Sequence, residues 1–182
     1  MRALYSQLKA DKTSLYRSAV ARLNCWAVDR PDMQHAVRIC SKSMSSPRVN
    51  DWQRPKRVAR YVKGCPDTEI MFEWTTAPGR LIVRSDSDWA GDKSTRKSVS
   101  AGNIRCGQHL LLSWSKDQTV VAMSSGEAEL YAACMAAQHA MGTESMAREL
   151  GVHLDATELQ GHANAAIGII GRQGSGNLRH LT

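Results

Sequence analysis

The sequence predicts an α/β domain with one compact core, preceded by a small helical segment. Two observations lead to this prediction. Apolar residues recur at helical spacing through the first part of the 182-residue chain. Beyond it, short strand-like stretches alternate with turn residues, and a long helix follows them. The character changes in the loop 75–79, so we expect residues 1–75 to form helices and residues 76–182 to form the α/β domain.

Three helices are expected in the first segment. Pro31 ends the first apolar pattern and suits the first position of a second helix, because its fixed φ is already helical. A third helix is predicted to begin at Asn50 as a cap and to stop at Gly64, with Pro55 bending its first turn. The first helix is predicted to turn one apolar face inward, made of Leu15, Ala19, Leu23, Trp26 and Ala27.

The third predicted helix is rich in cationic side chains. A solvated helix face explains such a run, and so does a helix that contacts phosphates, since several cations on one rod attract a backbone charge array. The net charge of +7 favours polyanionic partners such as nucleic acid, although a basic protein without such a partner has the same composition. The residues in question are Arg54, Lys56, Arg57, Arg60 and Lys63.

The second segment is predicted to begin with an antiparallel meander. Apolar residues 81–83 run into Ser-Asp-Ser-Asp at 85–88, and strands are expected at 98–106 and 109–115, with 117–123 as a further β-rich stretch. A long helix should start at Ser124, where Glu127 completes a capping box, and end at Gly151. Residues 157–162 are predicted to form another strand.

Two carboxylates could carry chemistry in this layout. Asp86 ends an apolar strand, where an oxygen ligand can meet a hard divalent cation, but Asp-x-Asp after a strand is also a common turn. Glu129 lies one turn into the long helix and could face the sheet beside Asp86, or could serve only as an acid that favours the helix dipole, worth about 0.3 to 1 kcal/mol. Together they would begin a two-metal phosphodiesterase site.

Other classes of protein are disfavoured. The five cysteines are odd in number and contain no Cys-x-x-Cys pair, so neither a disulfide framework nor a zinc site is predicted, and reduced thiols are expected. No apolar run is long enough to span a membrane, and the first residues do not resemble a secretory signal. The sequence therefore predicts a cytoplasmic or nuclear protein with no membrane partner.

Several motifs together resemble one family. The stretches "SDSDWAGDKSTRKSVSAG" and "LSWSKDQTVVAMSSGEAELYAA" resemble the ribonuclease H domain of Copia-type retrotransposon Pol polyproteins. Upstream, "YRSAVARLNCWAVDRPDMQHAVRICSKSMSSP" and "RVARYVKG" resemble the thumb and connection at the end of the same family's reverse transcriptase. The resemblance covers nearly all of residues 15–182, but the Tyr-x-Asp-Asp polymerase motif is absent from this sequence.

The resemblance implies a ribonuclease H fold, with a mixed five-stranded sheet flanked by helices, that cuts the RNA strand of an RNA–DNA hybrid with two Mg²⁺ ions. It places Asp86 and Glu129 as metal ligands, with Asp88 and Glu127 as weaker candidates. No small-molecule cofactor is implied. Structural parts of the matching motifs are Trp89, Trp114 and Ser124.

Departures from the family pattern predict impaired catalysis. His162 stands where the family has an aspartate, and Thr182 where it has another, so two of four expected carboxylates are absent. Imidazole is a poor ligand for Mg²⁺, which prefers oxygen donors. The sequence also stops where the family continues into a closing helix, which predicts a truncated domain. The alternative is a non-catalytic nucleic-acid-binding module or a decaying polyprotein fragment.

Overall fold

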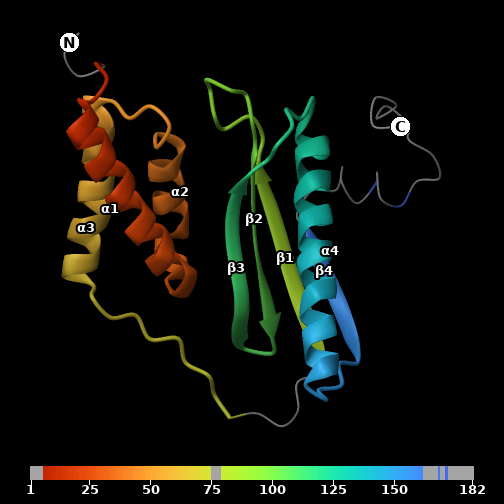
Figure 1. Cartoon of the computed structure of the whole chain (residues 1–182). Helices are drawn as coiled ribbons and strands as arrows, with labels where there is room; N and C mark the ends of the chain where they lie inside the picture. Colours follow the sequence, from red (N-terminus) through yellow and green to blue (C-terminus); the bar gives the residue numbers. More distant parts are fainter. Residues whose placement is uncertain (1–5, 75–78, 162–167, 169–170, 172–182) are drawn as a thin grey trace. The chain divides into compact units, whose positions relative to one another are not determined.

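A computed structural model describes residues 6–74, 79–161, 168 and 171. The chain divides into two compact units, Met1–Glu69 and Ile70–Thr182. Among the described residues, the elements of the first unit are helices, and the second has a sheet with one long helix against it (Figure 1). The division falls a few residues before the boundary that the sequence predicts near residue 75. Each unit is described by itself below.

The helical unit has the three predicted helices, two of them preceded by a short 3₁₀ turn. These helices are α1 (Ala10–Asp29), α2 (Gln34–Lys42) and α3 (Gln53–Gly64). The 3₁₀ turns are η2 (Pro31–Met33) and η3 (Val49–Trp52). Pro31 opens η2, as its fixed φ predicts.

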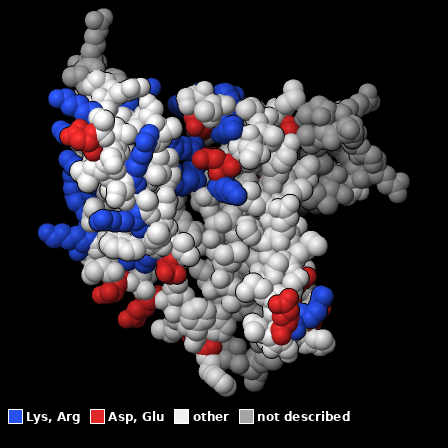
Figure 2. Space-filling model, viewed as in Figure 1, with Lys and Arg blue, Asp and Glu red and all other residues white. Residues whose placement is uncertain are grey.

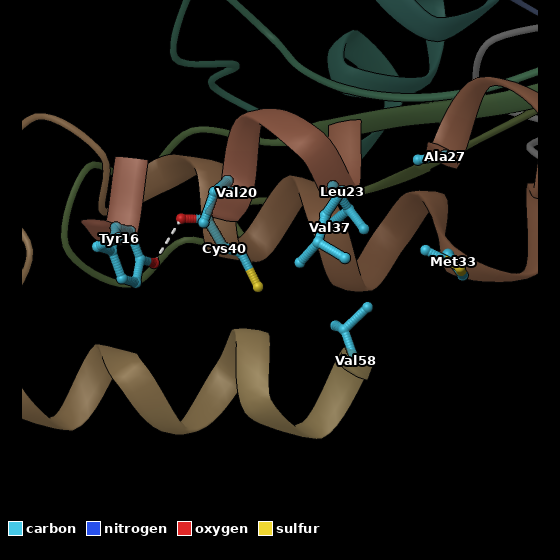
Figure 3. Close-up of a cluster of buried hydrophobic side chains, with 8 residues drawn as sticks. All are labelled: Tyr16, Val20, Leu23, Ala27, Met33, Val37, Cys40 and Val58. Carbon is cyan, nitrogen blue, oxygen red and sulfur yellow. Dashed lines mark hydrogen bonds between the residues drawn. The ribbon is translucent and has the colours of Figure 1, made fainter. Parts of the chain in front are cut away.

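The core of the helical unit shows that the predicted phase of α1 was partly wrong. Leu23 and Ala27 are buried as expected, but Leu15 and Trp26 are 60% and 57% exposed. Tyr16 takes the inward position instead, because its hydroxyl donates to the carbonyl oxygen of Cys40 at 2.8 Å and so satisfies a buried polar group (Figure 3). The full cluster is Tyr16, Val20, Leu23, Ala27, Met33, Val37, Cys40 and Val58.

The predicted ends of the third helix also need correction. Asn50 is not the cap, because it lies inside η3, and the carboxylate of Asp51 accepts the backbone N–H of Arg48 at 2.9 Å there instead. Pro55 is the third residue of α3, in the first turn, where its missing N–H leaves no helical bond unmade. Gly64 is the last residue of α3 rather than the residue after it.

The second unit contains a mixed sheet. Its strands are β1 (Arg80–Asp88), β2 (Val99–Cys106), β3 (His109–Asp117) and β4 (Ala156–Gly161), in the order β3-β2-β1-β4. β2 is antiparallel to both β1 and β3, whereas β4 is parallel to β1. Within the described residues the sheet has four strands, so the predicted fifth strand stays a prediction.

A single long helix, α4 (Ser125–Glu149), packs on one face of this sheet (Figure 1). Its inward side consists largely of alanines, which lets the helix approach the strands closely. Only half of the predicted capping box at Ser124 is seen: the Ser124 hydroxyl accepts the N–H of Glu127, whereas the Glu127 carboxylate accepts the N–H of Met123, one residue before the cap. Gly151 takes the left-handed conformation (φ +74°) just after the helix. The core between helix and sheet is made of Leu81, Val83, Ile104, Cys106, Ala136 and Ala140.

The predicted β-rich stretch 117–123 was wrong beyond Asp117, where β3 ends. The buried side chain of Gln118 leaves the strand pattern to donate to the hydroxyl of Ser100 at 3.0 Å and to the carbonyl oxygen of Ala128 at 2.8 Å. These two bonds join β2 to the first turns of α4. The chain from Gln118 to Ser124 therefore forms an irregular connection that holds the helix start against the sheet.

Candidate functional site

The structure brings Asp86 and Glu129 together. Asp86 lies near the carboxyl end of β1, and Glu129 lies just after the first turn of α4. The backbone N–H of Ser87 donates to Oε1 of Glu129 at 3.2 Å, which fixes the glutamate beside this strand. Two carboxylates from distant parts of the sequence therefore meet at one end of the sheet, and their role as metal ligands stays a prediction.

The electrostatics of Glu129 reflect this arrangement. Partial burial raises the pKa of its carboxyl group, and the negative charge of Asp86 raises it further, while the hydrogen bond from Ser87 opposes both effects. A carboxyl group that is desolvated beside a second carboxylate keeps its proton to higher pH than an ordinary glutamate. A cation placed between the two groups would remove the repulsion that causes this.

We expect Glu129→Gln to stabilise the metal-free protein at neutral pH. Because the folded chain keeps the Glu129 proton to higher pH than the unfolded chain, the free energy of unfolding falls as pH rises from about 4.3 through the raised pKa. The amide removes this fall, and its oxygen still accepts from Ser87. Urea unfolding between pH 4 and 8 in EDTA measures the difference, and a variant less stable than wild type at pH 7 would contradict the expectation.

The two weaker candidates serve as structural groups. Oδ1 of Asp88 accepts the backbone N–H of Val99 at 2.5 Å. Glu127 is 2% exposed, and its Oε2 accepts the N–H of Met123 at 2.8 Å while its own N–H donates to Ser124 Oγ at 3.2 Å. Both carboxylates are thus engaged by the backbone that shapes the site. Glu129 also accepts one backbone N–H, from Ser87, whereas Asp86 is exposed.

The number of carboxylates at this site limits the metal ions that it can hold. No cluster of three or more His, Cys, Asp or Glu side chains able to hold a metal occurs in the described ranges. Mg²⁺ commonly binds through one or two carboxylates and keeps several waters, so this pair fits one hydrated cation. It does not by itself fit the two-ion site implied by the resemblance. His162 and Thr182 lie outside the described residues.

The basic helix α3 separates into an outer stripe and one engaged arginine. Lys56, Arg57, Arg60 and Lys63 are all exposed, on the side of the helix away from its buried residues. None of these four has an ion pair with another residue in the described part of the chain. Arg54 differs, because its guanidinium lies 3.1 Å from the Asp51 carboxylate and donates to Ser43 Oγ at 3.2 Å. The four-residue stripe is therefore the part of α3 available to a polyanion.

Positive charge is concentrated in the helical unit. Residues 1–69 contain 14 Lys and Arg against six Asp and Glu, a net charge of +8, whereas residues 70–182 contain ten against eleven, a net charge of −1. Figure 2 shows Lys and Arg side chains spread densely over the helical unit. The overall charge of +7 is thus a property of one unit and not of the whole chain.

Sequence reasoning missed the groups that hold the carboxylate pair in place. Gln118 fixes the start of α4 to β2, and the indole N–H of Trp89 donates to the carbonyl oxygen of Ala122 at 3.1 Å. A glutamine in a β-rich stretch gives no sign of a buried role. Trp89, directly after β1, was expected to be structural, but its partner could be identified only from the fold.

The fold and the site together define a class: an α/β unit with paired carboxylates at the end of an interior strand, joined to a strongly cationic helical unit. The chain is 34% identical to the retrovirus-related Pol polyprotein from transposon RE2 of Arabidopsis thaliana, over 83% of its own length, and 34% identical to that from transposon TNT 1-94 of Nicotiana tabacum, over 76%. It belongs to the family of Copia-type Pol polyproteins of retrotransposons.

The chain spans about a tenth of the length of these polyproteins. It is also 36% identical to the secreted RxLR effector protein 161 of Plasmopara viticola, over 69% of this chain and 89% of that protein. No family model and no solved structure matches the chain. Among the described residues, no helix combines the length and apolar character that a membrane crossing requires.

Proposed function

We propose that this chain is a ribonuclease H-like part of a Copia-type polyprotein that binds RNA–DNA hybrid and holds one divalent cation, with impaired strand cleavage. The observation that carries the proposal is the meeting of Asp86 and Glu129 at the end of β1. The basic stripe on α3 supports the nucleic-acid partner. The mixed sheet, with α4 between its third and fourth strands, supports the ribonuclease H-like fold.

Each residue of the pair has a distinct part. Asp86 is exposed, so its carboxylate can reach a ligand from solvent. Glu129 is partly buried, and its carboxylate is oriented by the N–H of Ser87 and lies close enough to Asp86 for the two groups to interact. A bound divalent cation would polarise a phosphoryl oxygen of the nucleic acid. Asp86 and Glu129 would hold the cation in place beside that oxygen.

Cleavage is impaired because too few anionic ligands remain. The family pattern provides four carboxylates, whereas this sequence has two, with His162 and Thr182 in the other places. Close charge interactions are worth about 4 kcal/mol each at an effective protein dielectric, so losing two of them leaves the second cation weakly held. A neutral imidazole supplies neither the charge nor the oxygen donor that Mg²⁺ prefers.

Cation binding is the first test. Titrating the whole chain with Mg²⁺ or Mn²⁺ should raise its melting temperature, and manganese should broaden the NMR signals of residues around Asp86 selectively. Asp86→Asn and Glu129→Gln should each remove both effects. Glu149→Gln, at the other end of α4, removes one carboxylate elsewhere and should behave as wild type. Equal responses from all four proteins would overturn the cation site.

Cleavage of a labelled RNA–DNA hybrid is the second test. In Mg²⁺ the wild-type chain should cut no faster than its Asp86→Asn variant, and His162→Asp should raise the rate above both. Rapid cleavage by the wild-type chain would contradict the impairment. No gain from His162→Asp, in a variant that still binds hybrid and cation, would show that residue 162 does not belong to the site.

A further inference from the structure

The connection between β1 and β2, residues 89–98, carries three cations within five residues. Lys93, Arg96 and Lys97 follow directly on the strand that holds Asp86. The α/β unit as a whole has a net charge of −1, so this cluster is a local exception in it. The side chains of Lys93 and Arg96 are exposed.

Hydrogen bonds within the loop, from both its backbone and the side chain of Asp92, hold it in one shape. Oδ1 of Asp92 accepts the N–H of Ser94 at 3.0 Å and the hydroxyl of Ser94 at 2.7 Å. The backbone N–H of Arg96 donates to the carbonyl oxygen of Asp92 at 2.7 Å. The backbone N–H of Asp92 donates to the carbonyl oxygen of Lys97 at 3.2 Å. A closed turn of this kind presents its cations with little loss of conformational entropy on binding.

Arg96 occupies a backbone conformation that favours glycine. Its φ is +59°, which costs a non-glycine residue about 1 to 2 kcal/mol. A glycine would take this conformation without strain, so the backbone does not account for an arginine here. What the arginine adds is an exposed guanidinium, and strained residues of this kind gather at functional sites.

Both ends of the loop are fastened to the frame of the carboxylate pair. Oδ1 of Asp88 accepts the N–H of Val99 at 2.5 Å, and the N–H of Ala90 donates to Ser98 Oγ at 2.9 Å. Trp89 donates to Ala122, in the connection that leads into α4 and Glu129. The loop, β1 and the start of α4 are therefore joined by hydrogen bonds, which hold the loop at the same end of the sheet as the carboxylates.

The charge pattern identifies the class of ligand. Elsewhere in the described part of this unit the cations stand singly: Arg80 lies 3.3 Å from the Glu158 carboxylate, Arg84 donates to Gln160, and Arg105, Lys116 and Arg148 are isolated in the sequence. In this unit, only the loop gathers three cations within five residues. A carboxylate pair repels a polyanion unless cations flank it. Lys and Arg beside such a pair suit a phosphodiester backbone, which needs charge compensation close to the acidic groups.

We propose that Lys93, Arg96 and Lys97 form a phosphate-contacting site that seats the nucleic-acid backbone beside Asp86 and Glu129. This inference rests on the proposed function, because it assumes that the chain binds hybrid. It adds a second contact surface to α3, in the α/β unit itself, and assigns the loop a positioning role.

The test measures hybrid binding by the whole chain with Lys93→Ala and Arg96→Gly combined. Arg96→Gly removes the charge while suiting the φ of +59°, so the variant should fold and melt at or above the wild-type temperature. Its affinity for hybrid at 0.1 M salt should fall about tenfold or more, and the slope of log K against log salt should decrease by about 2. Arg105→Ala with Arg148→Ala is the control, since it removes equal charge toward the other end of the unit.

The outcomes separate the two proposals. If the wild-type chain binds hybrid and the loop variant binds as tightly as the control, the loop proposal is overturned and the proposed function stands. If the wild-type chain does not bind hybrid even at low salt, both are overturned. If poly-glutamate competes with hybrid as well as duplex of equal charge does, the loop is a general anion surface and the phosphate-contacting site is rejected.

Discussion

Replacing Lys56, Arg57, Arg60 and Lys63 together by alanine should weaken hybrid binding about 100-fold or more at 0.1 M salt. Each cation that neutralises a phosphate releases counterions, so the slope of log K against log salt should also fall, by about 3 to 4. The four side chains are exposed on one side of α3, away from its buried residues, so their removal should leave the helical core intact. Fluorescence anisotropy over a salt series measures both quantities.

A charge-conserving variant is the matched control for this prediction. Exchanging the four residues as Lys56→Arg, Arg57→Lys, Arg60→Lys and Lys63→Arg keeps every charge, so the salt slope should stay at the wild-type value. Arg54→Ala should instead lower stability more than affinity, because this arginine is paired with Asp51. An alanine variant with the wild-type slope would show that nucleic acid does not contact α3.

Gly102→Ala should destabilise the α/β unit by about 2 to 3 kcal/mol or more. A Cβ at this position would overlap the indole of Trp114 and the carbonyl oxygen of Arg84. Neither the indole nor the carbonyl group can easily move away from the added methyl group. β2 is hydrogen-bonded to a strand on each side, and the Trp114 ring packs against His139 of α4, with ring centroids 4.7 Å apart.

Gly142→Ala provides a control of opposite sign for this second prediction. Gly142 lies within α4, is exposed, and has no neighbouring atom within 4 Å of an added Cβ. Alanine should therefore stabilise the helix by about 0.5 to 1 kcal/mol. Urea unfolding monitored by circular dichroism compares the two variants. A Gly102→Ala protein as stable as wild type would mean that the sheet can open at this point.

Which segments form helices and which form strands was largely predictable from the sequence. Which face of a helix is buried was harder to predict. Prolines, glycines and the Ser124 N-cap indicated the order of the helices because they act locally. In α1, apolar residues lie on more than one side, so periodicity did not choose between Leu15 and Tyr16. The choice depends on a hydrogen bond to Cys40, which comes from another helix. Contacts of that kind have no local signature in sequence.

The same distinction holds for the candidate site. Motif spacing pointed to Asp86 and Glu129, and the structure places them together. It did not predict that Gln118 would leave the β pattern to anchor α4, because both of its partners are remote. The pairing of Arg54 with Asp51 could have been predicted, since opposite charges three residues apart on a helical turn lie close together.

The partition of charge between the two units has a consequence for avidity. The cationic stripe and the carboxylate pair belong to separately packed bodies that one continuous chain joins. Under the proposed function, a duplex bound by α3 would stay tethered to the α/β unit, at an effective concentration that depends on the length and stiffness of the connecting segment. Cutting the chain around Glu69 would leave each surface intact and remove this local enrichment.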